Sequence, residues 1–162
     1  MDLTVAEVAD DPEGKEAYEE VERAWKALAE DVRARIHLTC LPMADSEENA
    51  AMVNALQRRA DVVVQKSLAE GFGLTVAEAM WKSRPVVASR IGGIQDQIED
   101  GTSGILLDDP HDREAFATAV CSLLLDGERA DRMGREAHAR VQREFLGSRH
   151  LAQYVAICAE LV

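Results

Sequence analysis

Two glutamates on either side of a glycine-containing turn are the residues in this sequence best suited to chemistry. Glu70 and Glu78 are separated by seven residues, and Gly71 and Gly73 follow the first of them. Glycine adopts backbone conformations closed to other residues and lets a ligand approach the main chain closely. Carboxylates accept hydrogen bonds, which suits the vicinal hydroxyls of a sugar or a ribose. One acid at each end of a diphosphate-binding turn could hold the two rings of a sugar nucleotide.

The same residues also have a purely structural interpretation, and residue types alone leave both open. Thr75-Val-Ala-Glu78 matches a capping box, in which Glu78 would only satisfy the start of a helix. Gly71 and Gly73 could form a tight turn without any ligand. The dinucleotide fingerprint GxGxxG is absent, and so is a phosphate loop ending in Gly-Lys-Ser or Gly-Lys-Thr.

The elements around the turn favour a ligand site. Residues 61–65 (Asp-Val-Val-Val-Gln) form a β-branched run with little alternation, typical of a strand buried on both faces of a parallel sheet. A helix over 74–82 follows the turn. Open α/β sheets bind ligands at the carboxyl ends of their strands, and helix N-termini favour anions. We therefore expect a diphosphate to fit at this turn.

Strands alternate with helices along most of the chain, which predicts an α/β fold. The expected architecture is a Rossmann-like parallel sheet flanked by helices, with a helical tail over 111–162. We expect one domain over 1–162, truncated at its N-terminal side, because such domains have about six strands. The further expected strands are 3–9, 35–41, 84–89 and 104–107, and the further helices are 15–33, 46–59, 111–126, 128–144 and 148–161.

Composition narrows the possible partners. The net charge of −12 over 162 residues disfavours binding to nucleic acid or to an anionic membrane surface. Three widely spaced cysteines, Cys40, Cys121 and Cys158, indicate reduced, buried or half-buried thiols in a cytoplasmic protein. We expect no signal peptide and no membrane span. Scattered histidines and the lack of a ligand cluster predict no metal site.

The wider motif resembles the retaining GT-B glycosyltransferases of the large family four. The spacing of Glu70 and Glu78 matches that family's E-x7-E motif. In the family's order follow Pro85-Val-Val-Ala88, Gly92-Gly-Ile94 and Asp100-Gly101. Residues 64–67 and 75–82, with Trp81, are similar to the trehalose glycosyltransferring synthases, which join glucose from a nucleotide-glucose to free glucose. Other family-four enzymes, such as sucrose or glycogen synthases or trehalose phosphorylase, remain alternatives, as does a non-catalytic sugar-nucleotide-binding module.

The resemblance implies roles for individual residues. Glu70 would contact the donor glucose hydroxyls near the transferring centre, and Glu78 would hold the ribose hydroxyls. Thr75 would lie near the diphosphate, and Leu41 and Met43 would face the base. Gly92 and Gly93 are expected to form a neighbouring structural turn outside the binding site. The backbone lining the sugar and phosphate would be that of Gly71, Phe72, Gly73 and Leu74.

The resemblance also implies what this chain would need from elsewhere. The family's phosphate-binding Arg and Lys, and its acceptor-binding domain, have no counterpart in these residues. We therefore expect a nucleoside diphosphate sugar as ligand, no cofactor or metal, and an acceptor held by a missing N-terminal domain. The chain alone is expected to be inactive or nearly so. An apolar side of the last helix, with Leu151 and Tyr154, predicts a possible homodimer.

Overall fold

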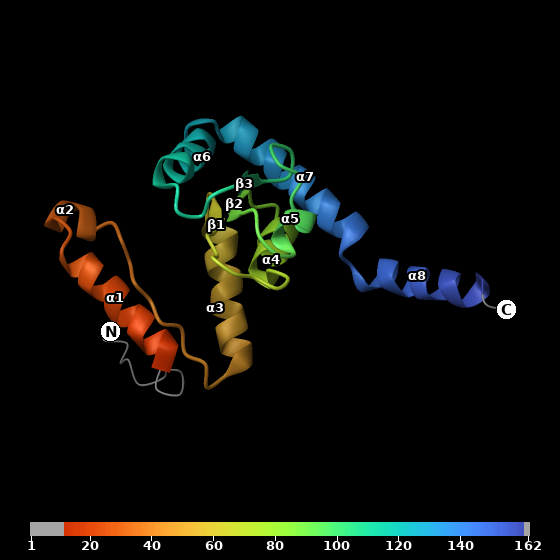
Figure 1. The fold of residues 1–162 in the computed structure, drawn as a ribbon, viewed down its shortest axis with the longest axis horizontal. Helices are drawn as coiled ribbons and strands as arrows, with labels where there is room; N and C mark the ends of the chain where they lie inside the picture. The colour runs from red at the N-terminus through yellow and green to blue at the C-terminus, as the bar shows by residue number, and fades with distance from the viewer. Residues whose placement is uncertain (1–11, 161–162) are drawn as a thin grey trace. The chain divides into compact units, whose positions relative to one another are not determined.

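The structure is a computed structural model, and it describes residues 12–160 (Figure 1). The chain divides into two compact units, one that ends at Asn54 and one from Ala55 onward. The strand predicted over residues 3–9 lies outside the described residues.

From residue 12 onward, the first unit consists of helices joined by irregular chain. Helix α1 spans Pro12–Lys26, α2 spans Glu30–Arg33, and α3, Ser46–Arg59, begins in this unit and runs into the second. The single helix predicted over 15–33 is therefore interrupted. The interruption spans residues 27–29, and the extended backbone of Ala29 (φ −56°, ψ 147°) cannot continue a helical hydrogen-bond ladder.

The strand predicted over 35–41 is wrong. Residues 36–43 form neither strand nor helix. Two of their carbonyl oxygens accept side-chain hydrogen bonds instead: Trp25 Nε1 donates to Ile36 O at 3.0 Å, and Asn49 Nδ2 donates to Pro42 O at 2.9 Å. A strand needs a neighbour to complete its ladder, and no described strand pairs with this segment.

The second unit contains a parallel sheet of three strands in the order β1-β2-β3. Strand β1 spans Val63–Gln65, β2 spans Val86–Ser89 and β3 spans Ile105–Leu107. Val87 of β2 lies opposite Val64 on one side and Ile105 on the other. All four residues of β2 are buried, as expected for the central strand of a sheet covered on both faces. The predicted strands over 61–65, 84–89 and 104–107 are thus confirmed within two residues at each end.

Helices cover both faces of this sheet (Figure 1). Alternate residues of β2 enter different hydrophobic clusters: Val86 and Ala88 pack with α4 (Leu74–Trp81) and α5 (Ile94–Gln97), and Val87 packs with α6 (Arg113–Leu125). Helix α7, Gly127–Glu144, supplies residues to both clusters. This arrangement confirms the predicted α/β class with a parallel sheet between helices.

Helix α7 approaches the turn after α4 closely. A Cβ added to Gly134 would lie 2.2 Å from the carbonyl oxygen of Ser83, so only glycine permits this approach. One helical turn further, the His138 ring stacks on Trp81 with centroids 4.6 Å apart, and its Nδ1 lies 2.5 Å from the Trp81 carbonyl oxygen. These contacts join α7 to the end of the helix that follows the glycine turn.

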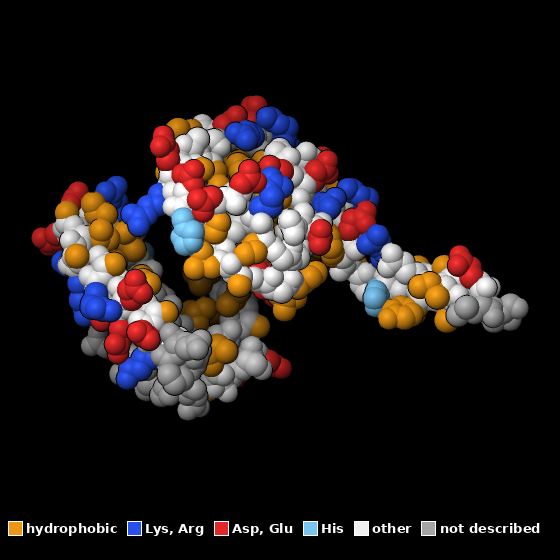
Figure 2. Space-filling view, viewed as in Figure 1, with side chains coloured by type: hydrophobic (Ala, Val, Ile, Leu, Met, Phe, Trp, Pro, Cys, Tyr) orange, Lys and Arg blue, Asp and Glu red, His pale blue; other side chains and the backbone are white. Residues whose placement is uncertain are grey.

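The C-terminal helix α8, Gly147–Glu160, is exposed along its length. Hydrophobic side chains lie along it in Figure 2, among them Leu151, Tyr154, Val155 and Ile157. The three predicted tail helices are confirmed by α6, α7 and α8. Among the described residues, no helix has the length and apolar run needed to cross a membrane.

The expectation of buried or half-buried thiols holds for one cysteine. Cys40 is half-buried, whereas Cys121 on α6 and Cys158 on α8 are exposed. The prediction is wrong for these two because each occupies the outward side of a surface helix.

The contact at Gly134 predicts a stability change. We expect Gly134→Ala to lower the free energy of unfolding by about 1–3 kcal/mol, because the added methyl group overpacks against backbone that cannot rotate away. Gly127→Ala on the same helix is the control, since a Cβ there meets nothing within 4 Å, and alanine favours a helix. Urea unfolding followed by circular dichroism measures both. Equal midpoints for the two variants would contradict the close approach.

Candidate functional site

The glycine turn follows β1 and leads directly into α4. Gly73 is the N-cap residue of α4, with φ of 87° in the left-handed region, and no side chain caps this helix end. The first N–H groups of a helix, here including those of Leu74 and Thr75, have no partner within the helix. An added Cβ at Gly71 would meet nothing within 4 Å, so its main chain faces open space. The turn therefore offers uncapped N–H groups beside accessible backbone, which suits an anion.

A second glycine turn, after β2, supports the first one from behind. Gly92 has φ of 50°, and a Cβ added there would lie 1.7 Å from the carbonyl oxygen of Glu70. The N–H of Gly93 donates a hydrogen bond to Gly71 O at 2.8 Å. The expectation that these two glycines form a structural turn is consistent with these contacts, which hold the backbone of Glu70 and Gly71 directly.

Gln97 also holds the turn, and sequence reasoning missed it. This side chain on α5 is fully buried, and its Nε2 donates to the carbonyl oxygens of Phe72 and, at 3.5 Å, of Gly73. Arg140 on α7 in turn donates to Gln97 O at 2.6 Å and to Asp96 O at 2.9 Å. The only signal in the sequence is a glutamine three residues after Ile94, which a surface helix would equally show.

Glu70 is half-buried beside the turn. Its Oε1 accepts the N–H of Gly71 at 3.0 Å, and its Oε2 has no hydrogen-bond partner among the described side chains and backbone. One carboxylate oxygen is thus fixed by the turn that it precedes. The other remains able to accept a hydroxyl hydrogen bond.

Glu78 lies one turn into α4 and is exposed. Its Oε2 accepts a hydrogen bond from Gln57 Nε2 of α3 at 3.3 Å. A capping box would require Thr75 as N-cap residue, but Gly73 occupies that place and no side chain caps the helix. The predicted capping box is therefore wrong, and the Glu78 carboxylate is held by Gln57 instead.

Two apolar side chains of the turn remain exposed. Phe72 is 45% exposed although its ring meets that of Phe145 edge-on at 6.3 Å between centroids, and Leu74 is 68% exposed. Thr75 is exposed as well. The structure thus brings Glu70, the turn and the start of α4 together on one accessible surface.

Leu41 and Met43 belong to the unit that ends at Asn54. Leu41 is half-buried there and Met43 is exposed. Their role as base-facing residues stays a prediction.

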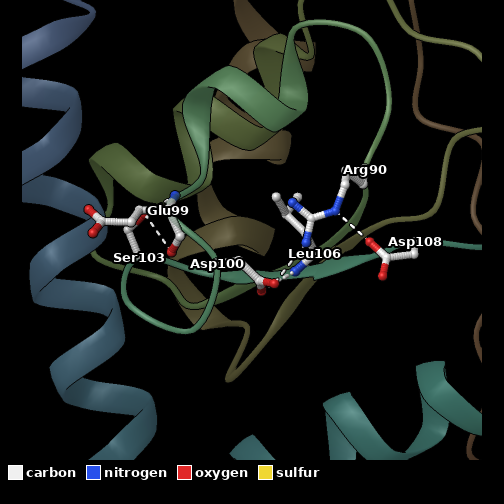
Figure 3. A network of polar contacts seen from close by, with 6 residues as sticks. All are labelled: Arg90, Glu99, Asp100, Ser103, Leu106 and Asp108. Atoms are coloured by element: carbon white, nitrogen blue, oxygen red, sulfur yellow. Dashed lines mark hydrogen bonds and ion pairs between the residues drawn. The ribbon is translucent and has the colours of Figure 1, made fainter.

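A charged network ties together the chain after β2 and β3 (Figure 3). Arg90 donates to Asp108 Oδ1 at 2.5 Å and to Asp100 Oδ2 at 2.8 Å, and Asp100 Oδ1 accepts the N–H of Leu106 at 2.9 Å. The hydrogen bond to Asp108 is the largest cause of a raised pKa for the Arg90 guanidinium; Asp100 also raises it, while desolvation opposes both. These bonds connect Arg90, just before the second glycine turn, to the residues on either side of β3.

Within residues 12–160, no three His, Cys, Asp or Glu side chains come together in a way that could hold a metal ion. The predicted independence from metals and cofactors stays a prediction.

Residues 14–140 match the family model described as glycosyl transferases group 1. This match covers more than half of the 162 residues, so the chain belongs to the group 1 glycosyltransferase family.

Individual relatives agree with this assignment. The trehalose synthase of Pyrococcus horikoshii is 40% identical over 152 residues, which are 94% of this chain and 34% of that protein. The sucrose-phosphate synthase of Thermosynechococcus elongatus superposes with a TM-score of 0.71 at 28% identity, covering 93% of this chain and 36% of that one. HepE of Anabaena, solved with UDP-glucose, superposes with a TM-score of 0.57 at 26% identity, covering 68% of this chain and 30% of the other.

The chain spans about a third of the length of the curated relatives it matches first. Together, the family match and the solved structures confirm the predicted family and the fold class, one half of a GT-B fold.

Because the second glycine turn packs against the first, replacing Gly92 by alanine should lower the free energy of unfolding more than replacing Gly101, although both glycines have positive φ. Gly92→Ala adds a clash with Glu70 to the backbone strain, whereas at Gly101 (φ 76°) a Cβ meets nothing within 4 Å. We expect Gly101→Ala to cost about 1–2 kcal/mol of unfolding free energy from strain alone, and Gly92→Ala to cost clearly more. Urea unfolding provides the comparison. A Gly92 variant as stable as the Gly101 variant would rule out the close contact.

The charged network predicts an order of effects for its two acids. Asp100→Ala should lower the unfolding midpoint more than Asp108→Ala, because Asp100 accepts both Arg90 and the Leu106 N–H, whereas Asp108 is largely exposed and pairs with Arg90. Thermal unfolding at low salt measures this difference. The reverse order would show that the Asp100 to Leu106 hydrogen bond does not hold the loop.

Proposed function

We propose that this chain is the donor-binding part of a retaining glycosyltransferase that uses a nucleoside diphosphate glucose. The observation that carries the proposal is the uncapped start of α4 behind the open Gly71–Gly73 turn, with a carboxylate at each end. Helix N-termini stabilise anions through their free N–H groups and dipole. The diphosphate would lie here, near Thr75.

The two carboxylates would bind the two sugar rings of the ligand. Glu70, with one oxygen fixed by Gly71, would accept hydrogen bonds from the glucose hydroxyls next to the transferring centre. Glu78, one helical turn further, would accept those of the ribose. The backbone from Gly71 to Leu74 would line the sugar and the phosphates, and Leu41 and Met43 would face the base.

Negative charge grows on the diphosphate as the glycosidic bond to it breaks. Preorganised N–H dipoles stabilise such charge without reorganisation at the moment of reaction. The start of α4 could supply this stabilisation without a metal ion or cofactor.

For the whole protein we propose glucosyl transfer to free glucose with retention at the anomeric carbon. The 40% identity to a trehalose synthase over 94% of this chain supports that acceptor. The sucrose-phosphate synthase likeness supports a second candidate, transfer to another sugar acceptor. The acceptor would be held by a domain outside these residues, so the chain alone should bind donor weakly and transfer little. Neither nucleic acid nor a membrane is proposed as a partner.

Ligand titration separates the two carboxylates. NMR titration of the chain with ADP, UDP and GDP, then with the matching diphosphate glucose, should move the signals of residues 70–78. Glu78→Gln should weaken binding of both ligands by about tenfold, since it removes the charge from a hydrogen-bond acceptor. Glu70→Gln should leave the affinity for the nucleoside diphosphate unchanged. It should remove only the additional affinity that the glucose group gives to the nucleoside diphosphate glucose.

Glu114→Gln, an exposed acid on α6, is the control and should change neither affinity. If no nucleoside diphosphate shifts the 70–78 signals at millimolar concentration, the proposed donor site is wrong. If the Glu70 variant loses both ligands equally, the division of roles is wrong.

A further inference from the structure

A buried amide connects Glu78 to the lysine that caps the C-terminal end of the same helix. Gln57 of α3 is only 6% exposed. Its Nε2 donates to Glu78 Oε2 at 3.3 Å, and its Oε1 accepts from Lys82 Nζ at 2.5 Å. Both contacts lie within the second unit, where Gln57 lies between Glu78 of α4 and Lys82, the C-cap residue of that helix.

The chemistry of the two partners fixes the direction of this amide. A lysine ammonium only donates hydrogen bonds, and an ionised carboxylate only accepts them. The Gln57 oxygen must therefore face Lys82, and the Gln57 nitrogen must face Glu78. The reversed amide would place its nitrogen against Lys82 and its oxygen against Glu78, and neither contact could form.

The position of Gln57 also keeps two opposite charges apart. Lys82 lies four residues after Glu78, a spacing at which side chains on a helix pair directly. No described ion pair joins these two residues, and each instead bonds to Gln57. Glu78 is thereby held through one oxygen by a neutral donor. Its Oε1 and its full charge stay available on the exposed side of α4.

We propose that Gln57 is a positioning residue for Glu78, with Lys82 setting the direction of its amide. Gln57 touches no part of the ligand. It holds the Glu78 carboxylate in the orientation in which the free oxygen accepts the ribose hydroxyls. Because this role rests on the proposed function of Glu78, the test must first show that Glu78 binds the ribose hydroxyls.

The test compares a nucleoside diphosphate with its 2′,3′-dideoxy form, which lacks both hydroxyls. The probes are the ADP and UDP pairs, and NMR titration of the chain gives the dissociation constants. The ratio of the two constants measures how much the hydroxyls contribute. In the unchanged chain we expect the dideoxy form to bind about tenfold more weakly, and Glu78→Gln to reduce that ratio strongly.

Gln57→Met keeps the length and packing of the side chain but removes both hydrogen bonds. We expect it to reduce the ratio to within about twofold while the dideoxy form binds as before. In the Glu78→Gln background, Gln57→Met should change the ratio no further, because the two residues act through one contact. Lys82→Met is a second variant, which removes the hydrogen bond that sets the direction of the Gln57 amide. It should also lower the ratio.

A purely structural role gives a different result. It would weaken both ligands equally and leave the ratio unchanged, which overturns the proposal while the donor site stands. If the unchanged chain binds neither diphosphate, or does not distinguish the dideoxy forms, the proposed role of Glu78 fails and that of Gln57 fails with it. Should Gln57→Met not fold, the Lys82→Met ratio decides between the same outcomes.

Discussion

The close contact between the two glycine turns is the constraint on which the site depends. The carbonyl of Glu70 occupies the space where any side chain at Gly92 would begin. Gly93 completes the contact with a hydrogen bond to Gly71. Each turn follows one of two neighbouring parallel strands, β1 and β2, so the sheet register sets their distance. The site is therefore made of backbone held by backbone, which leaves little freedom for rearrangement.

The supports behind this contact extend through the second unit. Gln97 binds the carbonyls of the first turn, and Arg140 on α7 binds the carbonyls around Gln97. Helix α7 itself is fixed against the turn after α4 at Gly134 and at the His138–Trp81 stack. Both ends of α4 are thus tied to elements that come later in the chain. A substitution on α7 could therefore alter the position of the Glu70–Leu74 turn through Arg140 and Gln97.

The sequence was sufficient to predict the three described strands and the tail helices, because continuous β-branched runs and helical periodicity are local signals. It also predicted the turn after β1 and the helix α4 that follows, while the roles of Glu70 and Glu78 stay predictions. It failed at 35–41, where apolar residues alternate as in a strand, but the carbonyl of Ile36 bonds to Trp25 and that of the following Pro42 bonds to Asn49. It could not identify Gln57 or Gln97, since a glutamine on a helix has the same local pattern whether buried or exposed. Their importance comes from contacts across more than 20 positions of chain.

The lack of a side-chain cap on α4 has a consequence for the stability of the protein. Its first amide groups have no partner within the helix and can donate hydrogen bonds to water or to an anion. A phosphate bound at the site proposed above would take the place that an aspartate or serine side chain has at the start of other helices. By mass action, whatever fills this position also stabilises the folded chain. Under the proposed function, the resistance of the chain to unfolding would therefore rise with the concentration of its nucleoside diphosphate ligand.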